Sequence, residues 1–475
     1  MINRRGFLAL STAAGMTAAC SSKAANTPSA SPAPPPALEM KFAPAEVDVD
    51  LGGPVVRTWA YTDRLPGNEI RIRKGQRLRA AVSNKLPAET SIHWHGLAIV
   101  NDMDGVPPLT QAAIPAGGDF TYDFVVPDAG TYWYHSHVGT QLDRGLYGAL
   151  IVEDPGEKGD YDDELVLVLD DWIDGTGTNP DQVLENLRKN GMKPMAPGGP
   201  GVSPTTPLGE DGGDVTYPYF LINGRVPADP DMRDYRDGQR IRLRVINAGS
   251  DTAFRVAVPG TTLNVIATDG YPVMPAQAKS VILGMGERFD ATFTVNGSVP
   301  VVAVPEGKQG HAQLNVRVAA KPSTVNVDDF VRSVRGDVTL DTATLSPTPE
   351  VTLPARTPDQ VIDAALSGPN AGYTWPFAGK LYDPTKDGIP VKRDQRVRMR
   401  MINESMMFHP IHLHGHTFQV VGDNAARARK DTVLVPPKKT VEVDFDTDNP
   451  GKWITHCHNT YHLEAGMAGW IFYES

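Results

Sequence analysis

The 475-residue chain is poor in cysteine, in basic residues and in long hydrophobic runs. Two cysteines are too few for a disulfide framework. The 56 acidic and 45 basic side chains give a net charge of −11, which argues against a nucleic-acid partner, because phosphates favour lysine- and arginine-rich surfaces. The apolar stretch at residues 7–19 is too short to span a bilayer, which needs about 20 residues. No later segment approaches that length. The 45 glycines and 41 prolines favour a loop-rich β architecture.

The first 38 residues are typical of an export signal followed by a tether. Residues 1–20 combine a charged start with a short apolar core, and Arg4-Arg5 before Phe7 resembles a twin-arginine signal. Residues 17–20 resemble a lipoprotein cleavage box with Thr17 where Leu is usual, so lipidation of Cys20 and simple cleavage of the signal are alternatives. Residues 21–38 are mostly Ser, Ala and Pro, which predicts a disordered tether. We expect an exported protein, in the cell envelope or periplasm, as a membrane-anchored lipoprotein, or secreted.

A short pattern occurs three times in the rest of the chain. In each copy a Gln precedes alternating basic and apolar residues and then an Asn; the copies span residues 75–84, 238–247 and 394–403. Alternation with period two predicts a half-buried strand. Three copies at one domain length predict an all-β protein of three homologous antiparallel sandwiches. We place these domains at residues 39–155, 156–325 and 335–475.

The repeat aligns most of the histidines. Eleven of the twelve lie in four short segments of the first and last domains. His93 and His95 stand nine and eleven residues after Asn84, and the same steps after Asn403 give His412 and His414. After Asn247 the same steps give valines, so the middle domain has no such pair. We interpret its one histidine, His311, as a surface residue, and His416 in the last domain as structural.

A second segment aligns the outer domains again. His135-Ser136-His137 matches His456-Cys457-His458. In this register three further residues of the last domain face non-ligands of the first: His409 faces Thr90, His462 faces Gln141 and Met467 faces Leu146. Each outer domain therefore carries two equivalent pairs of histidines, four pairs in all, and four other candidate ligands occur only in the last domain. Two sites of different kinds follow.

The side-chain chemistry separates the two sites. On a strand, residues i and i+2 point the same way about 6.6–6.8 Å apart, so each pair aims two imidazoles at one place. Eight imidazoles from two domains suit about three metal ions at an interface, and imidazole ligation admits Zn, Cu, Fe or Ni. Cys457 points to the opposite face, toward His409, His462 and Met467. Two histidines, a thiolate and a weak thioether are the ligands of a blue-copper electron-transfer site.

These motifs together resemble those of the multicopper oxidases of the three-domain laccase type. They stand here as His93-Trp94-His95-Gly96, His135-Ser136-His137, His409-Pro410-Ile411-His412-Leu413-His414, and His456-Cys457-His458 followed by His462 and Met467. The resemblance runs from about residue 40 to the end of the chain. It is greatest to exported copper-resistance oxidases of actinobacteria and mycobacteria, which share the twin-arginine start and endings like HCHNTYHLEAGM.

The resemblance implies three cupredoxin-like Greek-key domains and four copper ions. His93 and His412 would hold a type 2 copper, and Cys457, His409 and His462 a type 1 copper with Met467 as its axial ligand. The type 3 pair would be held by the remaining six: His95, His135, His137, His414, His456 and His458. Asp104 matches the family's acid that supplies protons. A second family acid near the HCH motif has no counterpart directly after His462, where Leu463 stands.

The implied reaction is four one-electron oxidations coupled to reduction of O₂ to water. Met407 resembles the position where bacterial copper-efflux oxidases bind Cu(I), although Ser405 replaces the neighbouring acid and no Met-rich insertion is present. We expect Cu(I) oxidation in copper resistance, with a laccase-like oxidase of phenols, aromatic amines or Fe(II) as the alternative. A non-catalytic copper-binding protein of the envelope would need one site only, and nitrite reductases lack a complete two-domain histidine cluster. We expect a monomer.

Overall fold

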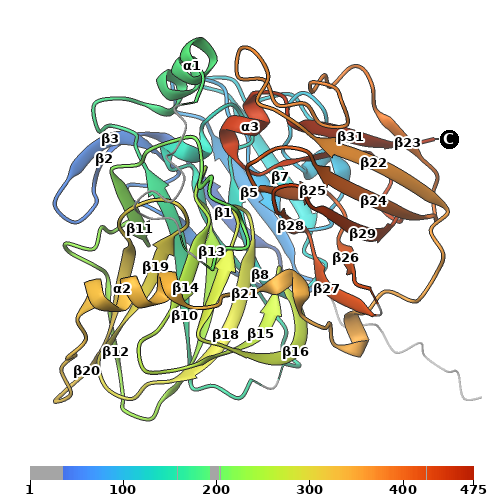
Figure 1. Cartoon of the computed structure of the whole chain (residues 1–475). Coiled ribbons are helices and arrows are strands. Elements are labelled where there is room, and N and C mark those ends of the chain that lie inside the picture. The colour runs from blue at the N-terminus through green and yellow to red at the C-terminus, as the bar shows by residue number, and fades with distance from the viewer. Residues whose placement is uncertain (1–35, 158, 193–202, 204, 424, 475) are drawn as a thin grey trace, which may run out of the picture. The chain divides into compact units, whose positions relative to one another are not determined.

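The computed structural model describes residues 36–157, 159–192, 203, 205–423 and 425–474. The predicted signal, Cys20 and nearly all of the predicted tether lie outside these residues. The described residues form seven β-sheets, with short helices between some of the strands (Figure 1). This confirms the predicted all-β architecture, although the sheets are mixed and not purely antiparallel, since residues 163–169 pair parallel with residues 241–247 and residues 360–366 with residues 397–403. None of the helices in this part of the chain is long and apolar enough to cross a membrane.

The first third of the chain forms three sheets, with orders β1-β5-β7, β2-β3 and β4-β9-β8-β6. Their strands are β1 (Leu38–Phe42), β2 (Ala45–Asp50), β3 (Val55–Ala60), β4 (Gly67–Arg73), β5 (Arg77–Ser83), β6 (His93–His95), β7 (Asp119–Val125), β8 (Gly130–His135) and β9 (Tyr147–Glu153). Two 3-10 turns, η1 (Asn101–Met103) and η2 (Leu142–Arg144), lie between them.

The middle third forms two six-stranded sheets, with orders β11-β10-β13-β18-β15-β16 and β12-β20-β19-β14-β17-β21. The strands are β10 (Asp163–Trp172), β11 (Tyr219–Ile222), β12 (Met232–Tyr235), β13 (Arg240–Asn247), β14 (Phe254–Ala257), β15 (Leu263–Thr268), β16 (Tyr271–Ala278), β17 (Ser280–Leu283), β18 (Arg288–Thr294), β19 (Val299–Pro305), β20 (Ala312–Val318) and β21 (Leu340–Asp341). Helices α1 (Pro180–Asn190) and α2 (Val327–Gly336) belong to its connections.

The last third forms two five-stranded sheets, with orders β22-β24-β29-β26-β27 and β23-β31-β30-β25-β28. The strands are β22 (Gln360–Leu366), β23 (Ile389–Val391), β24 (Arg396–Asn403), β25 (His409–Leu413), β26 (Phe418–Val421), β27 (Ala426–Lys430), β28 (Thr432–Val435), β29 (Thr440–Asp446), β30 (Lys452–Cys457) and β31 (Ala468–Tyr473). Helix α3 (Thr460–Glu464) and the turns η3 (Thr342–Thr344) and η4 (Pro349–Val351) complete the elements.

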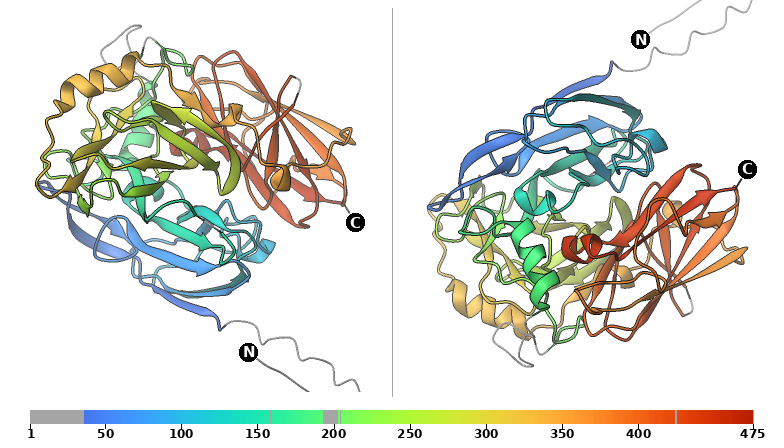
Figure 2. Two further views of the ribbon diagram at one scale, coloured as in Figure 1. Left: turned by 90° about the horizontal axis from the view of Figure 1, so that it is seen from below. Right: turned by 90° about the horizontal axis from the view of Figure 1, so that it is seen from above.

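The sheets follow the three thirds of the chain with one departure. Strand β21 pairs with β17 of the middle sheet, although it lies beyond residue 335, where we placed the start of the last domain. The domain boundaries themselves stay a prediction. Figure 2 shows the green and yellow strands of the middle third beside both the blue and the orange-red strands.

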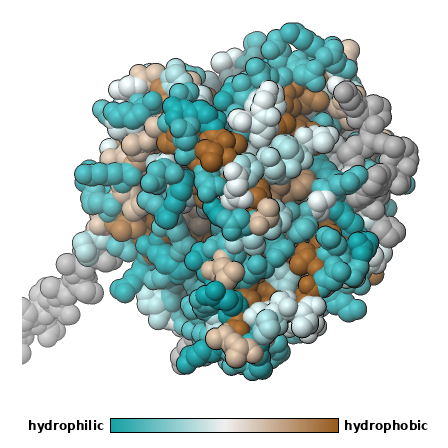
Figure 3. All heavy atoms as spheres, turned by 90° about the vertical axis from the view of Figure 1, so that its left-hand side faces the viewer, coloured by the Kyte–Doolittle hydropathy of each residue, from teal (hydrophilic) through white to brown (hydrophobic). Residues whose placement is uncertain are grey.

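Apolar packing joins the middle and last thirds. One continuous buried cluster contains residues of both, such as Leu243 and Phe289 with Phe445 and Trp453, whereas the first third has its own cluster around Trp94. The face seen in Figure 3 is mostly hydrophilic, and its hydrophobic side chains form small separate patches. Scattered apolar residues of this kind are normal on protein surfaces.

The repeated Asn has the same structural role in all three copies. Asn84, Asn247 and Asn403 are each at most 2% exposed and follow or end the equivalent strands β5, β13 and β24. Each side-chain amide donates to a backbone carbonyl four or five residues later and to a carbonyl of one distant segment, at Ile114, Leu283 or Val435. Each side-chain oxygen accepts from the backbone N–H two residues later. One side chain thus joins the connection that follows its strand to a second segment in all three domains.

Replacing Asn84 by Ala should lower the stability of the fold without touching a candidate ligand. The change removes the hydrogen bonds to the carbonyls of Ala88, Ile114 and Pro115 and the acceptor of the buried N–H of Leu86. We expect a loss of about 2–3 kcal/mol, seen as a melting temperature roughly 2–6 °C lower. Gln76→Ala is the control, since that side chain makes only surface hydrogen bonds. Equal melting temperatures for the two variants would contradict the role assigned to Asn84.

Candidate metal centre

Strand pairing brings the histidine pairs together. In the first domain β6 runs antiparallel to β8, with His93 opposite His135. In the last domain β25 runs antiparallel to β30, with His412 opposite His456. The predicted alternation therefore holds in both domains, and each sheet presents two pairs on one face.

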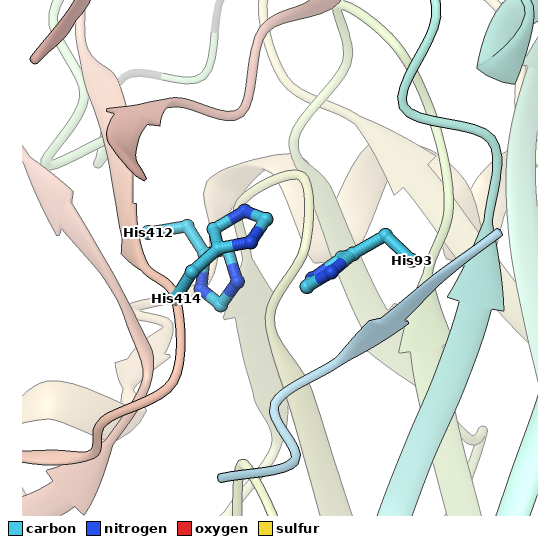
Figure 4. A group of neighbouring side chains, drawn as sticks. All are labelled: His93, His412 and His414. Carbon is cyan, nitrogen blue, oxygen red and sulfur yellow. The ribbon is translucent and has the colours of Figure 1, made fainter. Parts of the chain in front are cut away.

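The two outer domains then present these faces to each other. Histidine ring nitrogens approach within 4.8 Å of one another in three groups: His93 with His412 and His414; His93 with His95 and His135; and His137 with His414 and His456. Figure 4 shows His93, from the first domain, facing His412 and His414 of the last. The rings of His93 and His414 stack at 3.8 Å between centroids, and so do those of His95 and His412. His458 lies 5.0 Å from His95 in the same cluster. All eight predicted cluster histidines meet at this interface.

The ring nitrogens are arranged as metal ligation requires. His93, His135 and His456 each donate Nδ1–H to a backbone carbonyl at 2.8–2.9 Å. Nε2 of His93 and His135 is buried and has no hydrogen-bond partner among the described residues. Both ring nitrogens of His458 are likewise buried without a partner. A partner that fixes one nitrogen and leaves the other free is the usual arrangement around a metal-binding histidine, so the residues fit a bound metal.

Burial keeps these imidazoles ready to bind a metal. Desolvation, followed by repulsion from a neighbouring imidazole, lowers the pKa of six cluster histidines well below the ordinary value: His95, His135, His137, His414, His456 and His458. The same two causes lower the pKa of His409 at the other site. The neutral imidazole is the form that binds metal ions. At neutral pH the cluster therefore needs to lose few protons when a metal enters.

The second site lies on the other face of β30. Sγ of Cys457 is 3.6 Å from Nδ1 of His409 and 3.6 Å from Nδ1 of His462, and the two Nδ1 atoms are 3.1 Å apart. Cys457, His409 and His462 are all fully buried. Two nitrogens and one sulfur facing one point fit a soft metal such as copper.

Residues that the sequence analysis missed orient the outer nitrogens of this site. Ser405 Oγ lies 2.8 Å from Nε2 of His409, and Asp214 Oδ2 lies 2.9 Å from Nε2 of His462. Burial alone would lower the pKa of His462, but its hydrogen bonds to Asp214 and Cys457 raise it to about 10. Without a metal, His462 is therefore a cation paired with a carboxylate of the middle domain.

Helix α3 carries His462 and is held by the other two domains. Asn459 caps the helix by accepting from the N–H groups of Tyr461 and His462. Its amide donates to Asp251 of the middle domain at 2.6 Å, and the hydroxyl of Tyr461 donates to Asp143 of the first. Met467 is fully buried, and its carbonyl accepts from the N–H of Cys457 at 3.0 Å. Its axial role stays a prediction.

The corresponding place in the first domain is a hydrogen-bonded cluster. The carbonyl oxygen of the Gln141 side chain accepts from Thr90 Oγ1 at 2.8 Å and from Ser136 Oγ at 2.7 Å. The backbone pairing of Ser136 with Leu146, at 2.9 Å, matches that of Cys457 with Met467. The internal alignment thus places equivalent residues in equivalent positions, and only the last domain retains metal-binding side chains there.

Asp104 lies against the histidine cluster. It is 1% exposed, its carboxylate is 3.0 Å from Nδ1 of His414, and its carbonyl accepts from His93. His416 is buried in the last domain, where Nε2 lies 2.7 Å from the hydroxyl of Tyr473, in keeping with a structural role. His311 is partly buried and 3.4 Å from Gln313, away from both sites.

The structure separates Met407 from solvent. Met407 is 1% exposed and belongs to the main apolar cluster, whereas its neighbour Met406 is 66% exposed. The backbone of residue 407 pairs with Asp211, which places Asp211 and Asp214 next to this turn. Met406 is therefore the solvent-exposed methionine of this turn. The substrate-binding role of Met407 stays a prediction.

Comparison with known proteins identifies the family. Three sequence models described as multicopper oxidase match residues 45–157, 163–311 and 355–475. The chain is 43% identical to the multicopper oxidase MmcO of Mycobacterium tuberculosis over 98% of this chain and 95% of that protein. It is 27% identical to a copper resistance protein A homologue of Pseudomonas syringae pv. tomato, over 89% and 90% of the two chains.

Solved structures show the same fold. The crystal structure of Fet3p, described as a multicopper oxidase that functions in iron import, superposes with a TM-score of 0.78 at 22% identity over 92% of this chain and 91% of that one. A multicopper oxidase from Pseudomonas thermotolerans superposes with a TM-score of 0.70 at 27% identity over 92% and 99%.

The two sites should respond differently to pH when copper is added to the metal-free protein. Copper must displace the proton of His462, whose pKa is about 10, so affinity at the Cys457 site should fall as pH drops from 8 to 6, by about tenfold per unit for each proton released. The cluster histidines with lowered pKa values should lose little affinity over this range. Titration with Cu(II) at three pH values, following thiolate absorbance and total bound copper, measures both. Equal pH slopes at the two sites would contradict this prediction.

Proposed function

Because the chain is a three-domain multicopper oxidase, an oxidoreductase that uses O₂, we propose that it oxidises Cu(I) to Cu(II) in copper resistance. Four Cu(I) ions supply four electrons, and O₂ with four protons becomes two waters. The names of two relatives support this substrate class, since one is a multicopper oxidase of a mycobacterium and another a copper resistance protein.

We also propose export through the twin-arginine-like start, which cell fractionation of an Arg4-Arg5→Lys-Lys variant would test.

We propose the copper ligands that the resemblance implies. Cys457, His409 and His462 would hold type 1 copper with Met467 axial, His93 and His412 type 2 copper, and the six remaining cluster histidines the type 3 pair. When bound, these ions pass single electrons from substrate to O₂. The chain supplies the path between the sites, because Cys457 is bonded through the backbone to His456 and His458.

The observation that carries the substrate proposal is the acidic approach to His462. Asp214 accepts from Nε2 of His462 and also from the hydroxyl of Tyr373. Asp211 is partly exposed beside it, and burial followed by repulsion from Asp214 raises its pKa to about 6. Met406 is exposed and immediately precedes the residue whose backbone pairs with Asp211, and a thioether is a ligand for a soft cation.

Asp104 is suited to deliver protons at the histidine cluster. Its carboxylate contacts His414 and lies 3.2 Å from Nδ1 of His93, so it touches histidines of both outer domains. A positioned carboxyl group can transfer a proton to a reacting oxygen.

His137, which is half-buried, lines a cavity of about 590 Å³ together with Val106 and Tyr382. We propose that this cavity admits O₂ and releases water.

Replacing Cys457 by Ser tests the oxidase assignment. The variant should lose the blue thiolate absorbance and the turnover of every reductant together, because the sulfur ligand and the bonded path are both affected. Copper bound by the cluster should remain. Ser136→Ala is the matched control, since Ser136 occupies the equivalent position in the first domain. This variant should retain both the blue colour and the turnover. Turnover that survives the loss of colour would overturn the assignment.

Replacing Asp211 by Asn tests the cationic substrate. We expect KM for Cu(I) to rise about three- to tenfold, because a nearby negative charge is worth roughly 1 kcal/mol at a partly exposed site. The turnover of an uncharged phenol should not change. In the unchanged protein, KM for Cu(I) should also rise as pH falls through 6, where Asp211 gains a proton, and this dependence should be weaker in the variant.

Three further variants control this result. Asp237→Asn removes a distant surface charge that pairs with Lys321 and should leave KM unchanged. Met406→Leu and Met407→Leu separate the exposed methionine from the buried one. A rise in KM for Cu(I) in Met407→Leu alone would support the binding role predicted for Met407, and a rise in Met406→Leu alone would assign that role to Met406. Negligible Cu(I) turnover beside fast phenol oxidation would replace the Cu(I) assignment with a laccase-like one.

A further inference from the structure

The middle domain has no cluster histidine, yet it forms one wall of the cluster. The turn between β17 and β18 passes directly beside the imidazoles. Gly286, at φ +86°, lies so close that a Cβ atom added there would be 2.8 Å from Cδ2 of His458 and 3.1 Å from Cε1 of His95. Only a glycine fits this approach, because other residues rarely adopt that φ and would collide with the rings.

Two residues after this glycine, Arg288 joins all three domains. Its side chain is fully buried. Nε donates to the carbonyl of Thr131 in the first domain at 3.1 Å, and Nη1 donates to the carbonyl of Gly286 at 3.1 Å. The guanidinium then forms a two-pronged ion pair with Asp431 of the last domain, at 2.7 and 2.6 Å.

Asp431 contacts one histidine from each outer domain. Its carboxylate accepts from Nε2 of His95 at 3.1 Å, and its carbonyl accepts from Nδ1 of His412 at 2.8 Å. The opposite nitrogens, Nδ1 of His95 and Nε2 of His412, are buried without a hydrogen-bond partner within the described ranges. Asp431 therefore determines which nitrogen of each ring is left for a metal.

A second acid of the middle domain holds the backbone of the same segment. Asp269 Oδ2 accepts from the N–H groups of Asp431 and Thr432, at 3.3 and 3.2 Å, and Oδ1 accepts from the N–H of Arg288 at 2.9 Å. Lys430 lies 3.1 Å from Asp269 and 3.2 Å from Glu287. Five ionisable side chains of this network are fully buried: Asp269, Glu287, Arg288, Lys430 and Asp431. Each carries a desolvation cost that only its partners offset.

We propose that Arg288 is a positioning residue for the metal cluster: through Asp431 it sets the orientation of the His95 and His412 rings, so that the domain without metal ligands determines the geometry of the metal site. The inference rests on the proposed function only in requiring that the cluster bind copper. A lysine cannot replace the arginine, because one ammonium group cannot make the two parallel hydrogen bonds to Asp431 together with those to Thr131 and Gly286.

Arg288→Lys tests this role against a matched control. Arg255 is an equally buried arginine of the same domain, in a two-pronged ion pair with Glu306 at 2.7 and 3.3 Å and in contact with no cluster histidine. Both variants should lower the melting temperature. Only Arg288→Lys should weaken Cu(II) binding by the cluster, by about 10- to 100-fold, and shift the electron paramagnetic resonance parameters of cluster Cu(II). The thiolate absorbance of the Cys457 site should be unchanged in both.

The outcomes separate positioning from stability and from the substrate assignment. Unchanged cluster affinity and resonance parameters in Arg288→Lys, or equal changes in Arg255→Lys, would overturn the proposal. If Arg288→Lys does not fold, the isosteric variant Asp431→Asn carries the same expectation and the same contradicting result. Failure of the unchanged protein to oxidise Cu(I) would refute the substrate proposal alone, because these readouts measure copper binding and not turnover.

Discussion

The alternation of side chains along one strand is the constraint on which both sites depend. At the end of β30 the extended backbone directs His456 and the next residue but one, His458, to one face and Cys457 to the other, so three consecutive residues belong to two sites. Antiparallel pairing with β25 then places His412 opposite His456 and Ile411 opposite Cys457. A shift of one residue in this register would exchange the faces and destroy both sites at once. Both sites therefore require this one register.

Removing water from the cluster creates the next requirement. A buried imidazole needs a partner for the nitrogen that does not bind a metal. Backbone carbonyls accept the hydrogen bonds of this nitrogen in His135 and His456. Where the domains meet, carboxylates are the acceptors: Asp104 accepts from His414 and Asp431 accepts from His95. The backbone carbonyl of each of these aspartates also accepts a hydrogen bond from a histidine of its own domain, His93 for Asp104 and His412 for Asp431. The domain interface and the orientation of the ligands are thus held by the same few contacts.

The sequence allowed prediction of what is local and repeated, and little else. Strand periodicity and the repeated Asn placed His93 and His412 in equivalent positions, because a hydrogen-bonded loop junction conserves its spacing from copy to copy. Asp214, Asp431 and Arg288 could not be found in this way, since their partners lie 248, 336 and 143 residues away along the chain. The exposed neighbour of Met407 was also missed, because neither methionine carries a pattern that distinguishes the buried one.

The middle domain shows why a domain can lose its ligands and still be retained. Without it, the edge of the cluster beside His458 would meet solvent, and Asp431 would lack its buried counter-charge. A buried carboxylate that loses its partner is strongly destabilised, so it would either take up a proton or turn toward water. In both cases His95 would lose the acceptor that fixes its ring. The valines at the positions of the lost histidines complete the apolar core of this domain, while the turn that follows β17 serves the neighbouring site. The middle domain can therefore lack metal ligands and still cover the cluster, because Val256 and Val258 lie at and after the end of β14 whereas Gly286 lies after the end of β17.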